Sequence, residues 1–128
     1  MVLEYLDFDH SEEASGAASW DALASVPPGR LPAALREVHA VLAWAHAAFG
    51  APHEGDAELG EWSFDLQCLQ ERASGTGASA DLGLRYVARQ PRLEHEAIDP
   101  QGGRCTLSLS LSGSATFAQA FAEAFPLD

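Results

Sequence analysis

Lysine is absent from this 128-residue sequence, and its 7 basic residues, all arginines, are set against 19 aspartates and glutamates. The formal net charge of −12 disfavours nucleic acid and anionic membranes as partners, because both attract proteins largely through lysine and arginine. The same charge is compatible with a basic protein surface or a divalent cation as partner, although net charge also simply keeps a protein soluble. It therefore narrows the class of partner without naming one.

Cysteines and long apolar segments are also scarce. Cys68 and Cys105 form neither a CxxC pair nor a zinc-type spacing, so we expect them to be small, buried, reduced residues. The N-terminus lacks a basic stretch followed by an apolar one, and no window approaches the roughly 18 apolar residues of a membrane span. These absences predict a cytoplasmic protein. The length of 128 residues fits a single domain, residues 1–128, and the order of the predicted elements makes it an α+β domain.

Alternating apolar and polar residues predict strands over 2–8, 61–68, 82–89 and 104–112, with a further edge segment at 93–98. A short helical turn is predicted at 19–23. One amphipathic helix is predicted from Pro32 to about Phe49. A second is predicted near the C-terminus, with Thr116 and Gln119 at the spacing of a capping box.

One-sided alternation is typical of an antiparallel sheet with one solvated face. The expected fold class is therefore α+β: a two-layer sandwich with an antiparallel sheet of four to five strands and two helices packed on one face. If the protein binds something flat, the solvated face or its acidic rim is the expected place. That face is expected to carry Ser63, Asp65, Gln67, Arg85, Arg89, Thr106, Ser108 and Ser110.

The segment LDFDHSEE, residues 6–13, concentrates carboxylates around His10. Asp7 and Asp9 share one face of the predicted strand, and Glu12 and Glu13 follow it, so their oxygens could converge on a hard cation. The spacing fails the EF-hand pattern, because the glycine and the final glutamate of that loop are missing. Charged residues at a strand end also protect a sheet edge from unwanted pairing.

Catalytic signatures are missing from the sequence. There is no G-x-S-x-G nucleophile elbow, and the segment Gly75-Thr76-Gly77 lacks the lysine of a phosphate-binding loop. His39 and His46 lie about two helical turns apart, too far to share one metal ion unless a third element bridges them, and are expected on a solvated helix face. We therefore expect no catalytic residue and no cofactor.

Four segments, YLDFDHSEE, HAVLAWAHAAFG, EWSFDLQ and LSLSLSGSATFAQAFAEAF, together resemble a family of small, acidic, uncharacterised proteobacterial proteins. The resemblance covers most of the chain. It implies a coherent fold, and it brings no activity, cofactor or catalytic residue with it.

Two functional hypotheses remain. The first is a non-enzymatic domain that docks an acidic surface on a basic protein, as small immunity or antitoxin proteins do, and it is preferred because it needs only surface charge. The second is a divalent-cation or small-ligand binding protein or enzyme with an Asp/His cluster. A homodimer is compatible with either. The first uses Asp7, Asp9, Glu12 and Glu13 with Trp20 and Trp62 as partly exposed anchors, and the second uses Asp7, Asp9, His10, His53 and Asp56.

Overall fold

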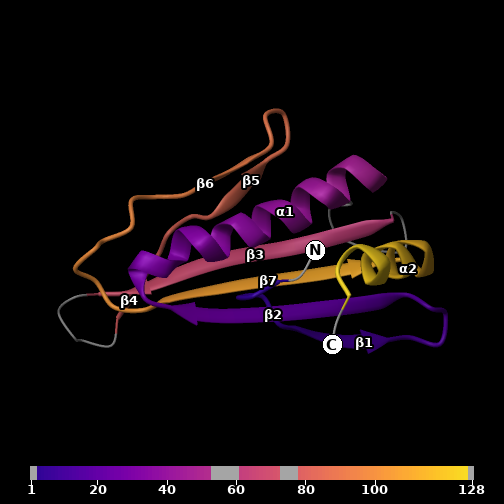
Figure 1. Ribbon diagram of the computed structural model, residues 1–128, viewed down its shortest axis with the longest axis horizontal. Coiled ribbons are helices and arrows are strands. Elements are labelled where there is room, and N and C mark those ends of the chain that lie inside the picture. The colour runs from indigo at the N-terminus through magenta and orange to yellow at the C-terminus, as the bar shows by residue number, and fades with distance from the viewer. Residues whose placement is uncertain (1–2, 53–60, 73–77, 127–128) are drawn as a thin grey trace.

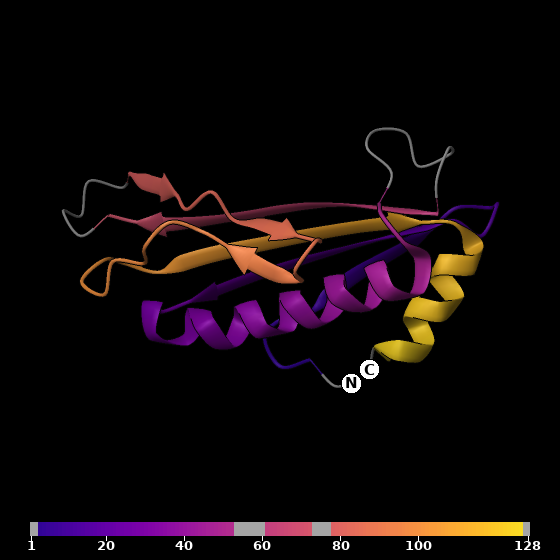
Figure 2. The ribbon, with the colours of Figure 1, turned by 90° about the horizontal axis from the view of Figure 1, so that it is seen from above.

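The computed structural model describes residues 3–52, 61–72 and 78–126. Its elements are β1 (Phe8–Glu12), β2 (Ala18–Val26), the 3-10 helix η1 (Pro28–Arg30), α1 (Leu31–Phe49), β3 (Trp62–Glu71), β4 (Ser79–Asp81), β5 (Arg85–Val87), β6 (Arg92–Glu94), β7 (Cys105–Gly113) and α2 (Ala115–Ala124). Five strands form one antiparallel sheet in the order β1-β2-β7-β3-β4 (Figure 1). Both helices lie on the same side of it (Figure 2), which gives the predicted two-layer α+β sandwich.

The core lies between the sheet and the helices. β7 alternates strictly, because its leucines and Cys105 point to the helices while its threonine and serines point away. Phe117 and Phe121 of α2 are fully buried against the same layer. The packing stripe predicted for α1 is confirmed, since the helix buries Leu31, Leu35, Val38, Val41, Leu42 and Ala45. Within the described ranges, no helix combines the length and apolar character needed to cross a membrane.

The chain before β1 is held by a side chain rather than by strand pairing. The carboxylate of Glu37, a buried residue of α1, accepts hydrogen bonds from the backbone N–H groups of Glu4, Tyr5 and Leu6 at 2.9 to 3.2 Å. Because these N–H groups bond to the Glu37 side chain and not to a neighbouring strand, the predicted strand at 2–8 is wrong for residues 3–7. β1 begins at Phe8. Residue 2 lies outside the described residues.

The helical turn predicted at 19–23 is wrong, because this segment belongs to the nine-residue strand β2. Ala18, Trp20, Ala22, Ala24 and Val26 are buried and alternate with exposed or half-buried neighbours. Three of these inward residues are alanines, whose helix preference hides the alternation. Pairing with β1 on one side and β7 on the other overrides that local preference.

α2 begins one residue after Ser114, whose Oγ accepts a hydrogen bond from the Phe117 N–H at 3.2 Å. Ser114 is therefore the N-cap, and the capping box predicted from Thr116 is wrong. The hydroxyl of Ser114 also donates to the Glu61 carboxylate. This pair ties the start of α2 to the segment that enters β3.

β5 and β6 form a separate two-stranded hairpin beside α1 (Figure 1). The prediction that Arg85 and Arg89 belong to the solvated face of the main sheet is therefore wrong: Arg85 lies in β5 and bonds to Glu94, and Arg89 lies in the turn that follows. The hairpin also half-covers the histidines of α1. His39 Nε2 lies 3.0 Å from the Pro91 carbonyl oxygen, and the His46 ring stacks on Tyr86 at 4.7 Å.

Candidate interaction site

The sheet face opposite the helices, here called the outer face, carries mostly short polar side chains. Ser11, Ser19, Ser112 and Ser63 are register neighbours and form one row across β1, β2, β7 and β3. The hydroxyl oxygens of Ser63 and Ser112 are 2.6 Å apart, and those of Ser11 and Ser19 are 3.3 Å apart. Hydrogen bonds between neighbouring serines hold these short side chains close to the sheet, so this part of the outer face is flat.

The next row is acidic. Asp9, Asp21, Ser110 and Asp65 are register neighbours across the same strands, and we call them the acidic row. The Ser110 hydroxyl donates to Asp21 Oδ1 at 2.6 Å, whereas the ion pairs among the described residues involve none of these aspartates. Asp9 and Asp21 stand directly opposite each other, an arrangement in which like charges destabilise a sheet.

The acidic row borders a shallow depression of about 390 Å³. Asp7, at the entrance to β1, lines it together with Asp9 and Asp21, and Leu23 adds an apolar wall. Among the large apolar side chains of the described residues, that of Leu23 is the most exposed to solvent, at 68%. The depression therefore combines three carboxylates with one exposed apolar contact.

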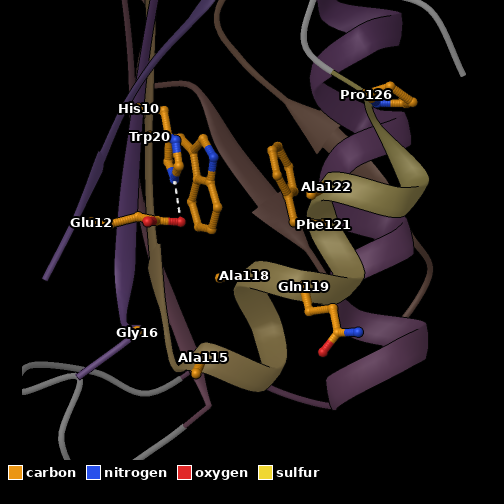
Figure 3. A pocket seen from close by; sticks show the side chains of 10 residues that line it. All are labelled: His10, Glu12, Gly16, Trp20, Ala115, Ala118, Gln119, Phe121, Ala122 and Pro126. Carbon is orange, nitrogen blue, oxygen red and sulfur yellow. Dashed lines mark ion pairs between the residues drawn. The ribbon is translucent and has the colours of Figure 1, made fainter. Parts of the chain in front are cut away.

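A second hollow lies on the opposite, helix-bearing face of the sheet, between β1 and α2 (Figure 3). We call this hollow, of about 470 Å³, the β1–α2 groove. Its sheet side presents His10 and Glu12, whose Nε2 and Oε1 atoms are 3.7 Å apart, and the His10 ring stacks on Trp20 at 5.4 Å. Its helix side is lined by Ala115, Ala118, Gln119, Phe121 and Ala122.

The structure separates the residues of the hypothetical metal site. Asp9 is register-paired with exposed Asp21, and His10 with buried Trp20, so the two side chains point to opposite faces of the sheet. His53 and Asp56 lie outside the described residues. Within the part of the chain that the structure describes, no group of three or more His, Cys, Asp or Glu side chains is placed to hold a metal ion.

Trp20 and Trp62 are core residues, which corrects their prediction as partly exposed interface anchors. Trp20 is 2% exposed and packs on Phe121 with ring centroids 4.6 Å apart. Trp62 is 0% exposed, and its indole N–H donates to the Gly50 carbonyl at 3.1 Å. Both rings fill the space between the sheet and the helices, so neither presents its face to a partner.

The four predicted acids divide between the two surfaces. Asp7 and Asp9 lie at the outer-face depression, and Glu12 lies at the β1–α2 groove. Glu13 is exposed in the turn after β1, where its backbone bonds to Gly16 and Ala17. Asp21 completes the acidic row and is not among the predicted site residues, because a helical turn is predicted at 19–23. The alternation of Trp20, Ala22, Ala24 and Val26 with Ser19, Asp21 and Ser25 is the signal that would find it, although the apolar Leu23 interrupts this alternation.

The two cysteines are buried free thiols, as predicted. Burial raises the pKa of the Cys68 thiol to about 11, with smaller contributions from Cys105 and Asp81, and burial also raises the pKa of Cys105. Because the thiolate is the reactive form, we expect iodoacetamide at pH 8 to alkylate Cys68 about 100-fold more slowly in the native protein than in the urea-unfolded chain, and Cys105 more slowly as well. Equal rates in the two states, followed by mass spectrometry, would contradict this burial.

No protein-family model, curated protein or solved structure matches this chain.

Proposed function

We propose that this protein is a non-enzymatic protein-interaction domain whose acidic row docks on a basic surface of another protein. The observation that carries the proposal is the register that sets Asp9 opposite Asp21. Like charges in this position cost stability, and a cationic group between them would relieve the repulsion. Asp65 extends the negative charge across β7 to β3, so a basic surface can meet several carboxylates at once.

The distribution of basic residues supports the same proposal. Arg85 lies in the β5–β6 hairpin, and Arg104 precedes β7 at the end of that strand opposite the serine row. Arg104 donates to Ser25 Oγ at 3.0 Å and to the Ser25 carbonyl at 2.6 Å, so its guanidinium is held at that end. The net charge of −12 would in addition attract a basic partner over long range and speed association.

We further propose a cytoplasmic location, because a reducing compartment would maintain the free thiols of Cys68 and Cys105. Membership of the proteobacterial family suggested by the sequence stays a prediction.

The proposed docking is tested with acetylated octa-arginine as a basic probe, by calorimetric titration at low and at physiological salt. The variant Asp9→Asn/Asp21→Asn/Asp65→Asn keeps the side-chain shapes and removes three charges. At about 0.5 kcal/mol for each exposed charge pair, we expect this change to weaken binding about tenfold at low salt, and less at higher salt. The triple variant should also melt no lower than the wild type, because the repulsion between Asp9 and Asp21 is removed.

The matched control is Glu4→Gln/Glu96→Gln/Glu123→Gln, which removes the same charge from exposed side chains outside the acidic row. We expect it to weaken binding by less than about twofold at physiological salt, because exposed charges separated by more than about 8 Å are then largely screened. Equal weakening by both triple variants would mean that only net charge attracts the probe, and would contradict the proposal. Undetectable binding to the wild type would contradict it as well.

A further inference from the structure

We infer that the basic partner is held by an extended segment that pairs antiparallel with the free edge of β1 and places alternate side chains in the β1–α2 groove. This inference rests on the proposed function, since it specifies the part of the partner that binds. β1 is the first strand in the sheet order and pairs with β2 on one side. Among the described residues, no strand pairs with its other side.

Every second residue of β1 directs its backbone N–H and C=O groups to that free edge. The Glu13 N–H donates to the Ala17 carbonyl at 2.8 Å, and along an antiparallel pair every second residue bonds to the partner strand. Counting back in steps of two, Ser11 and Asp9 bond to β2. The N–H and C=O groups of Phe8, His10 and Glu12 therefore point to the free edge, where an added strand can pair with them.

The same three residues direct their side chains to the helix-bearing face, because they are register partners of Ala22, Trp20 and Ala18, which are buried there. A residue of an added strand that lies opposite His10 would share this face and reach the β1–α2 groove. Figure 3 shows the groove between the sheet side, with His10 and Glu12, and α2, with Ala118 and Ala122. Small apolar side chains on α2 leave room there for an apolar side chain of medium size.

The acidic residues at the β1 edge determine which side chains fit at the outer-face positions of the bound segment. Residues of an added strand that point to the outer face would lie beside Asp9, with Asp7 and Asp21 in the same depression. Arginine or lysine is the complementary side chain at these positions. The segment that fits is therefore one in which basic residues alternate with apolar residues of medium size.

A second copy of this chain fits the edge poorly. Its own β1 would bring Asp9 and Glu12 to an edge that already carries Asp9 and Glu12, and the two chains would each carry a net charge of −12. Charged edge strands are a common protection against indiscriminate pairing. At β1 the acids would exclude acidic and neutral strands and admit a basic one.

The test compares two peptides of identical composition, one with four Arg-Val repeats and one with four arginines followed by four valines. Docking by charge alone predicts that the peptide with contiguous arginines binds at least as tightly, whereas strand addition predicts that the alternating peptide binds about tenfold more tightly, from a few added backbone hydrogen bonds. In that arrangement the valine amides face β1 and the arginine amides face solvent. N-methylation of the valines should therefore abolish the tenfold preference, and N-methylation of the arginines should leave most of it.

A protein variant tests the groove independently. Ala122→Trp places an indole in the groove from an exposed position of α2, and we expect it to remove the preference for the alternating peptide. The control Ala48→Trp adds the same side chain at an exposed position of α1 and should retain the preference. Both variants are first required to melt like the wild type; the N-methyl series needs no protein variant and decides the question if they do not.

The outcomes separate this inference from the proposed function. If the alternating peptide binds no more tightly than the block peptide and the acidic-row variant weakens both, acidic docking stands and strand addition is overturned. If neither peptide binds although octa-arginine does, the inference fails and the proposed function stands. If octa-arginine does not bind either, both fail. A dimer of this chain in solution that Ala122→Trp dissociates would show that a second copy occupies the edge, and would also overturn the inference.

Discussion

Replacing Glu37 with alanine is expected to lower the free energy of unfolding by about 3–5 kcal/mol, because hydrogen bonds to a charged group contribute about 1.5–3 kcal/mol each and unpaired buried N–H groups are costly. The carboxylate accepts from three consecutive backbone N–H groups, those of Glu4, Tyr5 and Leu6. The Leu6 bond is fully buried, so no water would replace the lost acceptor there. These residues lead directly into Asp7 and β1, so the loss should also loosen the acidic edge.

Urea unfolding followed by circular dichroism measures this effect, and hydrogen exchange of the Tyr5 and Leu6 amides locates it. Arg36→Ala changes the exposed neighbour on the same helix and should alter stability by less than about 0.5 kcal/mol. Glu37→Gln keeps one acceptor oxygen and should fall between alanine and the wild type. If Glu37→Ala unfolded at the same urea concentration as Arg36→Ala, the carboxylate would not be the anchor of residues 4–6.

Gly113→Ala is expected to destabilise the protein by about 2–3 kcal/mol, as overpacking of a filled core does. A Cβ atom at Gly113 would lie 2.4 and 2.5 Å from two ring atoms of Phe117. The ring has little room to move, since Phe117 is 0% exposed and its ring packs against those of Trp20, Trp44 and Trp62. Gly113 also stands in register with Trp62 on one side and Ala18 on the other, which restricts movement of the strand.

The control for this prediction is Gly29→Ala, where an added Cβ meets nothing within 4 Å. We expect Gly29→Ala to be neutral or slightly stabilising, because alanine restricts the unfolded chain. A double variant with Phe117→Leu should recover part of the loss at Gly113, which a double-mutant cycle of thermal melts would detect. Equal melting temperatures for Gly113→Ala and Gly29→Ala would contradict the close contact between β7 and α2.

The sequence pattern predicted the elements whose periodicity is strong. β3 and β7 alternate with large apolar residues, and α1 carries a stripe of leucines and valines between Pro32 and Gly50. The sequence pattern does not predict β2, because alanine fills three of its five inward positions and the apolar Leu23 occupies an outward one, so the contrast between the two faces is weak. The sequence pattern places the start of β1 too early, because Glu37, more than thirty positions away, accepts hydrogen bonds from the backbone of residues 4–6.

The candidate site depends on features that a single segment does not contain. Asp9, Asp21 and Asp65 lie on three strands, and only the register of β1, β2, β7 and β3 places them in one row. The local concentration of charge identifies Asp7 and Asp9 as candidates, whereas Asp21 joins them only once β2 is known to be a strand. The β1–α2 groove joins residues near both ends of the chain, and such a pairing follows from tertiary packing alone.

The acidic row is proposed as a docking surface for basic proteins. The most direct measurement is a titration of isotopically labelled protein with acetylated octa-arginine, followed by nuclear magnetic resonance. We expect the largest shift changes on the backbone amides of Asp9, Asp21, Asp65 and Ser110, and we expect 0.5 M salt to remove them, because the Debye length is then only about 4 Å. Shift changes spread evenly over all exposed acids, or centred on residues outside the outer face, would contradict it.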